Sequence, residues 1–183
     1  ILVDSGIGTP EGREALEAGL RKAGVEIRDI QAILLTHGHP DHFGLAHEIR
    51  EKSGATVIAH GGDRSLIEGF PGTHRSALVK FAETGLLHGF PVERFQEAVD
   101  KYHASDQVAS PVSVDRTITD GERIEFGSIR LLAVYTPGHS NGSTCYYGDG
   151  QIFSGDTVLE HGTPVTFFRG KRSRMGPGEF RTS

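Results

Sequence analysis

The sequence is poor in cysteine, in long apolar runs and in basic charge. Cys145 is the only cysteine among 183 residues, so an internal disulfide is excluded, and its strand-like surroundings predict a buried, inert thiol. The longest apolar run, 131–135, has five residues, whereas a membrane-spanning helix needs roughly 20. Acidic residues outnumber basic ones by 24 to 19, which argues against a surface that neutralises a phosphate backbone. We therefore expect a small-molecule substrate, no nucleic acid and no membrane as partners.

The length and composition predict one folded domain. A chain of 183 residues can bury one hydrophobic core but is too short for two ordinary domains. With 36% hydrophobic and 23% charged residues, it differs from low-complexity and disordered chains. The chain begins at Ile1 rather than at a methionine, so we expect a processed or truncated start of a cytoplasmic protein.

The apolar patterns change along the chain. Short apolar runs at 1–3, 32–35 and 56–59 predict buried strands, and helical spacing over 10–23 and 43–52 predicts a helix between each pair. Residues 61–110 are rich in glycine and proline between helical stretches, which indicates an inserted helical cap. Later apolar runs around two glycine-containing turns predict antiparallel hairpins; the runs are 123–126, 129–135, 143–147 and 151–154.

Histidine is abundant, and its placement points to metal binding. Residues 37–42, HGHPDH, put three histidines and a carboxylate directly after a predicted buried strand. Protonated, these groups would repel one another, and buried without partners they would lose solvation, whereas one or two divalent cations would satisfy them all. A ligand set of imidazole and carboxylate without thiolate suits zinc first and iron or manganese next. A solvated histidine-rich loop is the alternative.

Two further motifs follow predicted strands in the same way. TPGHS at 136–140 places His139 after one strand, and SGDT at 154–157 places Asp156 after another. Three strand ends thus present metal ligands. Catalytic zinc sites commonly use three protein ligands and an open position, while paired metals share a bridging oxygen. The inventory allows either arrangement.

These motifs, in this order, resemble those of the metallo-β-lactamase superfamily. Its members carry His-x-His-x-Asp-His, then a histidine often within Thr-Pro-Gly-His, then an aspartate within Gly-Asp, and Val3-Asp4-Ser5-Gly6 is similar to the family's Val-Asp-Thr-Gly. The resemblance implies an α+β fold, the αββα sandwich of the family, here incomplete. It implies one partial domain over 1–183, with the helical insertion at 61–110 as its variable part.

The resemblance also implies a role for each site residue. By this likeness the first metal is held by His37, His39 and His139, and the second by Asp41 and His42, with Asp156 bridging the two. Asp4 supports the ligand loop by hydrogen bonds without touching metal. Asp41 is also placed to orient the attacking water or accept its proton. The other histidines are not expected to bind metal, and among them His74, His88 and His103 are expected at the surface or within the cap.

The sequence departs from the family pattern near its ends. The second metal usually gains one more histidine late in the domain, but no histidine follows His161, which lies too close to Asp156 for that role. We therefore expect Ile1 and Ser183 to be cut ends of a longer protein, or the chain to be a shortened member with an incomplete second site. A partial sheet exposes strand edges, so we expect association between copies of the chain.

The function implied is that of a glyoxalase II-like metallo-hydrolase. Metal-bound hydroxide would attack an acyl bond, in a thioester, a lactone or a similar compound, while the metal polarises the carbonyl. A β-lactamase or a lactonase would use the same site. A persulfide dioxygenase would instead use one iron, through His37 or His39 together with His139 and Asp156. A non-catalytic metal-binding fragment is the remaining alternative.

Overall fold

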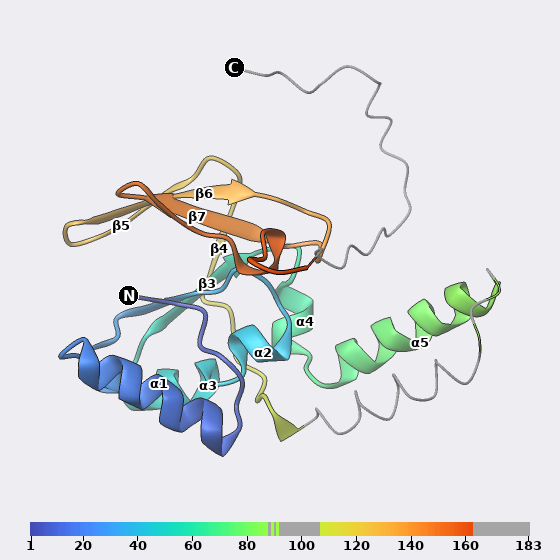
Figure 1. Ribbon diagram of the computed structural model, residues 1–183, viewed down its shortest axis with the longest axis horizontal. Helices are drawn as coiled ribbons and strands as arrows, with labels where there is room; N and C mark the ends of the chain where they lie inside the picture. Colours follow the sequence, from blue (N-terminus) through green and yellow to red (C-terminus); the bar gives the residue numbers. More distant parts are fainter. Residues whose placement is uncertain (88, 90, 92–106, 163–183) are drawn as a thin grey trace.

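The chain folds as two β-sheets packed face to face, with helices over one of them (Figure 1). The computed structural model describes residues 1–87, 89, 91 and 107–162. The first sheet has the order β1-β2-β3-β4 and the second the order β5-β6-β7-β8. This confirms the predicted α+β sandwich.

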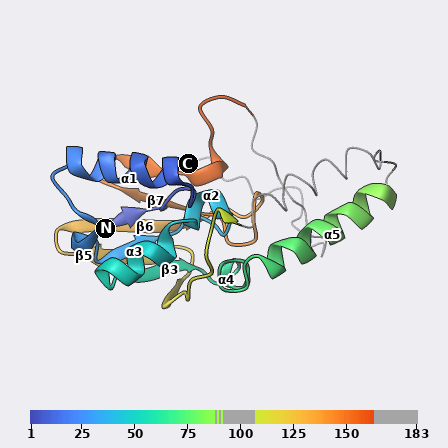
Figure 2. The same ribbon diagram turned by 90° about the horizontal axis from the view of Figure 1, so that it is seen from below.

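All neighbouring strands of the first sheet are parallel, as expected when helices connect successive strands. Its strands are β1 (Leu2–Val3), β2 (Ala32–Leu34), β3 (Thr56–His60) and β4 (Arg116–Ile118). Helices α1 (Pro10–Lys22) and α3 (Ala46–Ser53) cover its outer face, as Figure 2 shows from below. The Thr9 hydroxyl accepts a hydrogen bond from the Gly12 N–H, which satisfies one of the free donors at the start of α1.

The second sheet is antiparallel throughout, as its hairpin turns predicted. Its strands are β5 (Arg123–Phe126), β6 (Ile129–Tyr135), β7 (Thr144–Gly148) and β8 (Gln151–Phe153). Alternate residues point toward the first sheet, so Leu131, Ala133 and Tyr146 are buried between the sheets. Within the described residues, no helix lies over the opposite face of this sheet (Figure 1).

Strand β2 lies at the centre of the hydrophobic core. Ile33 packs toward the helices, whereas Ala32 and Leu34 pack toward the second sheet. Because both faces of β2 are covered, every position in the strand is apolar and fully buried. The loop that follows β2 is therefore held by a rigid strand.

The remaining helices are short, except for one that projects from the sandwich. They are α2 (Pro40–Phe43), α4 (Arg64–Glu68) and α5 (Gly72–Leu87), with 3-10 turns at Ile27–Asp29 and Gly155–Thr157. Helix α5 extends away from the two sheets (Figure 1). Together, α4 and α5 occupy the first part of the predicted insertion at 61–110. Residues 88, 90 and 92–106 of that insertion lie outside the described residues.

One local prediction was wrong, and one strand was missed. The helix predicted over 43–52 is divided, because α2 ends at Phe43 and α3 begins at Ala46. The chain segments containing Gly8 and Val108 cross at Gly44, where a Cβ atom would lie 2.5 Å from backbone atoms of both. Strand β4 was not predicted, since it buries only Ile118 and its other side chains are exposed.

Among the described residues, no helix has the length and apolar character needed to span a membrane.

Candidate metal centre

Three chain segments meet at one end of the sandwich and carry the predicted ligands. The segment 36–42 follows β2, the segment 136–143 joins β6 to β7, and Gly155–Thr157 follows β8. The sequence places their histidines and aspartates far apart, but the ends of these strands are neighbours in the fold. The predicted ligands His37, His39, His42, His139 and Asp156 therefore come together.

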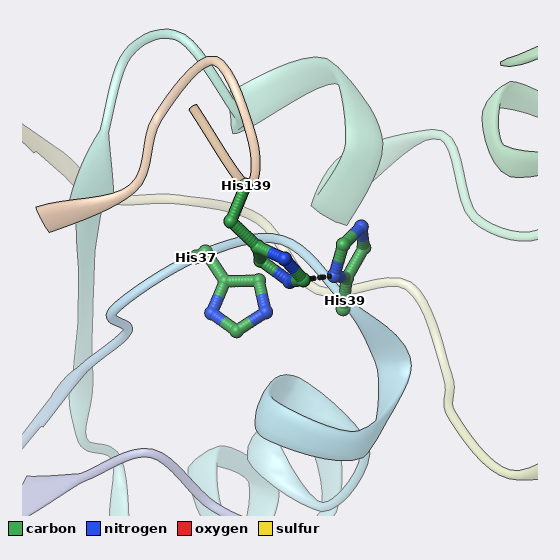
Figure 3. Close-up of side chains that lie close together, drawn as sticks. All are labelled: His37, His39 and His139. Atoms are coloured by element: carbon green, nitrogen blue, oxygen red, sulfur yellow. Dashed lines mark hydrogen bonds between the residues drawn. The ribbon is translucent and has the colours of Figure 1, made fainter. Parts of the chain in front are cut away.

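The first group consists of His37, His39 and His139, shown in Figure 3. One nitrogen from each ring lies within 4.8 Å of the other two, and His39 Nδ1 is 2.8 Å from His139 Nε2. The ring of His37 is buried, and within the part of the chain that the structure describes its Nε2 has no hydrogen-bond partner. A buried polar atom without a partner is costly, and a metal ion would satisfy it.

The second group consists of His37, His42 and Asp156. The two carboxylate oxygens of Asp156 face different histidines: Oδ1 is 3.3 Å from His42 Nε2, and Oδ2 is 3.3 Å from His139 Nε2. One carboxylate thus spans the two groups. This is the placement that the resemblance implied for a bridging residue.

Asp4 supports this arrangement from the end of β1. Its Oδ1 accepts a hydrogen bond from the Thr36 N–H at 2.8 Å, and its Oδ2 accepts one from the Thr36 hydroxyl at 2.8 Å. The same Oδ2 lies 2.8 Å from Nδ1 of His42. With Nδ1 donating to Asp4, the lone pair of a neutral His42 is on Nε2, which faces Asp156. Asp4 thereby sets both the tautomer and the orientation of the ring.

The electrostatics favour neutral rings at His37 and His39. Burial, and then the nearby His42, His39 and His139, lower the pKa of His37 far below its usual value. Burial and then His139 lower the pKa of His39 to about 4. Burial alone would lower the pKa of His42 as well, but the carboxylates of Asp4, Asp41 and Asp156 outweigh burial and raise this pKa. Since a neutral imidazole is the form that binds metal, the donors fit a divalent cation.

Asp41 lies at the edge of the site. Its side chain is 60% exposed, and its Oδ2 is 3.8 Å from His42 Nε2. It belongs to neither of the two ligand groups found among the described residues. Its predicted role as a ligand of the second metal stays a prediction.

Among the other histidines, His88 and His103 lie outside the described residues. His161 is 91% exposed in its side chain, and His47 is exposed on α3. His74 lies on α5, within the insertion to which it was assigned. This residue is buried against Phe43 and Phe70, and its Nε2 donates a hydrogen bond to the Gly38 carbonyl at 2.8 Å. Nothing in its local sequence indicated this burial, because the contact depends on how α5 leaves α4.

Sequence reasoning also missed Asp63. This aspartate comes just before α4 and is completely buried, with its carboxylate bonded to both histidine-bearing segments. In the sequence it lies between two glycines and an arginine, like many exposed loop aspartates.

Comparison with known proteins gives consistent matches. The sequence model of the metallo-beta-lactamase superfamily matches residues 1–179. A probable metallo-hydrolase of Bacillus subtilis, YqgX, is 30% identical over 133 residues, which are 72% of this chain and 51% of that protein. A hydroxyacylglutathione hydrolase of Brucella anthropi is 25% identical over 175 residues, which are 90% of this chain and 49% of that protein.

A solved structure shares the fold. The metallo-beta-lactamase family protein TTHA1429 from Thermus thermophilus superposes with a TM-score of 0.69 at 31% identity, covering 88% of this chain and 52% of that one. The chain spans about half the length of these relatives. The family match extends over nearly all of the chain, and it includes every residue of the two ligand groups. The chain therefore belongs to the metallo-β-lactamase superfamily.

Proposed function

We propose that this chain carries the metal centre of a hydrolase that cleaves an acyl bond in a small molecule, with zinc as the metal. The observation that carries the proposal is the pair of ligand groups that share His37, whose buried Nε2 has no hydrogen-bond partner among the described residues. A neutral imidazole in this position would offer that nitrogen to a metal ion.

The donor types favour zinc. The two groups offer imidazole nitrogens and one carboxylate, and the buried thiol of Cys145 belongs to neither. Such a set suits zinc first, with iron and manganese as alternatives. His37, His39 and His139 would hold one ion and leave it open to water or substrate. A second ion would be held by His42 and Asp156, with Asp41 as a further ligand.

The residues of the chain divide the work. A bound divalent metal lowers the pKa of coordinated water and polarises a carbonyl oxygen. The carboxylate of Asp156 lies between His42 and His139 and would hold the two ligand groups at a fixed spacing. Asp4 holds the His42 ring in the orientation that directs Nε2 into the site. The exposed carboxylate of Asp41, 3.8 Å from His42 Nε2, would orient the attacking water or accept its proton.

The substrate class comes from the relatives. The hydroxyacylglutathione hydrolase of Brucella anthropi acts, by its name, on an acylated thiol, and the protein from Bacillus subtilis is described as a probable metallo-hydrolase. We therefore place a thioester first, followed by a lactone and a β-lactam.

The proposal is tested by metal content together with turnover. Elemental analysis of protein purified without added metal should find one or two zinc ions per chain, and the protein should hydrolyse a thioester faster than a lactone or a chromogenic β-lactam. Replacing His37 by alanine should abolish both zinc uptake and turnover. His47→Ala, which removes an exposed histidine on α3, serves as the matched control and should change neither.

Other outcomes contradict the proposal in different ways. One iron per chain with oxygen-dependent turnover of a persulfide would assign a dioxygenase. Bound zinc without turnover of any of the three substrates would assign a non-catalytic metal-binding role. Full zinc uptake by His37→Ala would show that the metal binds elsewhere.

A further inference from the structure

The carboxylate of Asp63 receives hydrogen bonds from three donors on two separate segments. Its Oδ2 accepts from the Gly38 N–H at 2.8 Å and from the Ser140 hydroxyl at 2.5 Å. Its Oδ1 accepts from the Gly142 N–H at 2.8 Å. Asp63 itself is anchored by its own N–H, which donates to the His60 carbonyl at the end of β3. We refer to Asp63 and these three donors as the Asp63 clamp.

The clamp acts next to all three histidines of the first ligand group. Gly38 is the single residue between His37 and His39, and Ser140 directly follows His139. A side chain from a third segment, at the junction of β3 and α4, therefore joins the two segments that carry the histidines. A backbone hydrogen bond from the Thr144 N–H to the Thr36 carbonyl, at 2.9 Å, also joins these parts of the chain. The clamp acts closer along the chain to His39 and His139.

Close packing shows that the two segments are fitted around this carboxylate. A Cβ atom at Gly142 would lie 2.6 Å from Cγ and 2.7 Å from Cβ of Asp63, and one at Gly38 would lie 3.1 Å from Asp63 Cβ. Only glycine permits such an approach at Gly142. The carbonyl of Gly38 is held from the other side by Nε2 of His74. Both polar groups of this residue are thus bonded to buried side chains.

We propose that Asp63 is a positioning residue of the metal centre, which sets the spacing of His37, His39 and His139 before the metal binds. The inference rests on the proposed function, because it assigns Asp63 to the same site. A ligand group that is already ordered loses less conformational freedom on binding, so the metal is held more tightly.

Asparagine is the informative replacement, because it has nearly the same shape but only one oxygen. Its carbonyl oxygen can replace either Oδ1 or Oδ2, and its NH2 group then faces an N–H or O–H donor instead of accepting from it. With the oxygen at the Oδ2 position, the Gly142 N–H loses its acceptor, and with the oxygen at the Oδ1 position, the Gly38 N–H loses its acceptor. Replacing groups that orient metal ligands typically weakens metal binding by about 10- to 100-fold, and we expect this range for Asp63→Asn.

The test measures metal binding by the full chain rather than turnover. Co²⁺ is titrated into metal-free protein in competition with a chelator, and visible absorption reports the geometry of the bound ion. Asp63→Asn should bind the first Co²⁺ about 10- to 100-fold more weakly, with an altered spectrum. Ser140→Ala, which removes one of the three donors, should cause a smaller loss in the same direction.

Asp115→Asn is the control for a purely structural role. Asp115 also accepts a backbone N–H, from Val57 at 2.8 Å, and it pairs with Arg50, but it contacts neither histidine segment. This variant should lose some stability and keep the wild-type Co²⁺ affinity and spectrum. Circular dichroism of each variant shows whether it is folded.

The outcomes separate the inference from the proposed function. Wild-type affinity and spectrum in a folded Asp63→Asn would overturn the inference alone. If Asp63→Asn does not fold, wild-type Co²⁺ binding by Ser140→Ala would overturn it instead. A wild-type chain that takes up no Co²⁺ would overturn the proposed function, and the inference with it.

Discussion

Replacing Asp4 by asparagine should destabilise the metal-free protein and weaken binding of the second metal that we propose at His42 and Asp156. Asp4 accepts three hydrogen bonds, two from Thr36 and one from Nδ1 of His42, all at 2.8 Å. The asparagine oxygen can keep at most the two bonds at Oδ2, and its NH2 group then faces the Thr36 N–H. In the other orientation, both donors at Oδ2 lose their acceptor.

The size of the effect follows from these contacts. Leaving one buried donor without a partner costs about 1–3 kcal/mol, and replacing a charged acceptor by a neutral one costs about 1 kcal/mol more. We therefore expect the free energy of unfolding to fall by about 2–4 kcal/mol. With a urea dependence of about 2 kcal/mol per molar, the unfolding midpoint should fall by about 1–2 M.

The first assay is urea unfolding in the presence of a chelator, monitored by circular dichroism. The second is a metal titration of the folded protein without chelator. In the titration, the second metal ion should bind about 10- to 100-fold more weakly to Asp4→Asn than to wild type. Asp29→Asn is the control, because this exposed carboxylate accepts the Glu26 N–H at 2.8 Å far from the site. Its free energy of unfolding should change by no more than about 0.5 kcal/mol. An Asp4→Asn protein that unfolds at the wild-type midpoint would refute the reasoning.

Three further predictions concern the ligand rings and the core. The pKa of His39 is about 4 in the metal-free fold and 6.5 in the unfolded chain, so the unfolded chain takes up the proton first as the pH falls. Protonation of His39 should therefore lower the free energy of unfolding by about 3 kcal/mol between pH 7 and pH 4. Urea midpoints of the metal-free protein across this range should therefore fall less steeply in His39→Asn than in wild type. Equal slopes would contradict the assignment. Tyr146→Phe should lose about 1–3 kcal/mol of unfolding free energy, since it removes the buried hydroxyl that donates to the Leu35 carbonyl at 2.8 Å, while metal affinity should not change. Gly44→Ala should lower the melting temperature, because the alanine Cβ would lie 2.5 Å from backbone atoms of the crossing segments and such overpacking costs about 1–3 kcal/mol. An unchanged melting temperature would mean that the crossing segments can separate.

Local sequence determined much of this fold because burial leaves a local pattern. The unbroken apolar run of β2 follows from its cover on both faces, and the polar turns between later strands predicted the antiparallel sheet. Strand β4 escaped prediction because an edge strand with one buried residue has no such pattern. The break at Gly44 escaped for a different reason, since it depends on segments more than 30 residues away.

The sequence by itself determined which residues could bind metal, and only the tertiary structure decided how they are held. Ligand types and their places after strands can be read locally, so His37, His39 and His139 were identified before their rings were seen to converge. Asp63 could not be found in this way, because its carboxylate accepts a hydrogen bond from Ser140, which lies 77 residues further along the chain. The physical reason is that coordination chemistry depends on side-chain type, whereas support depends on which segments the packed sheets bring within hydrogen-bond distance.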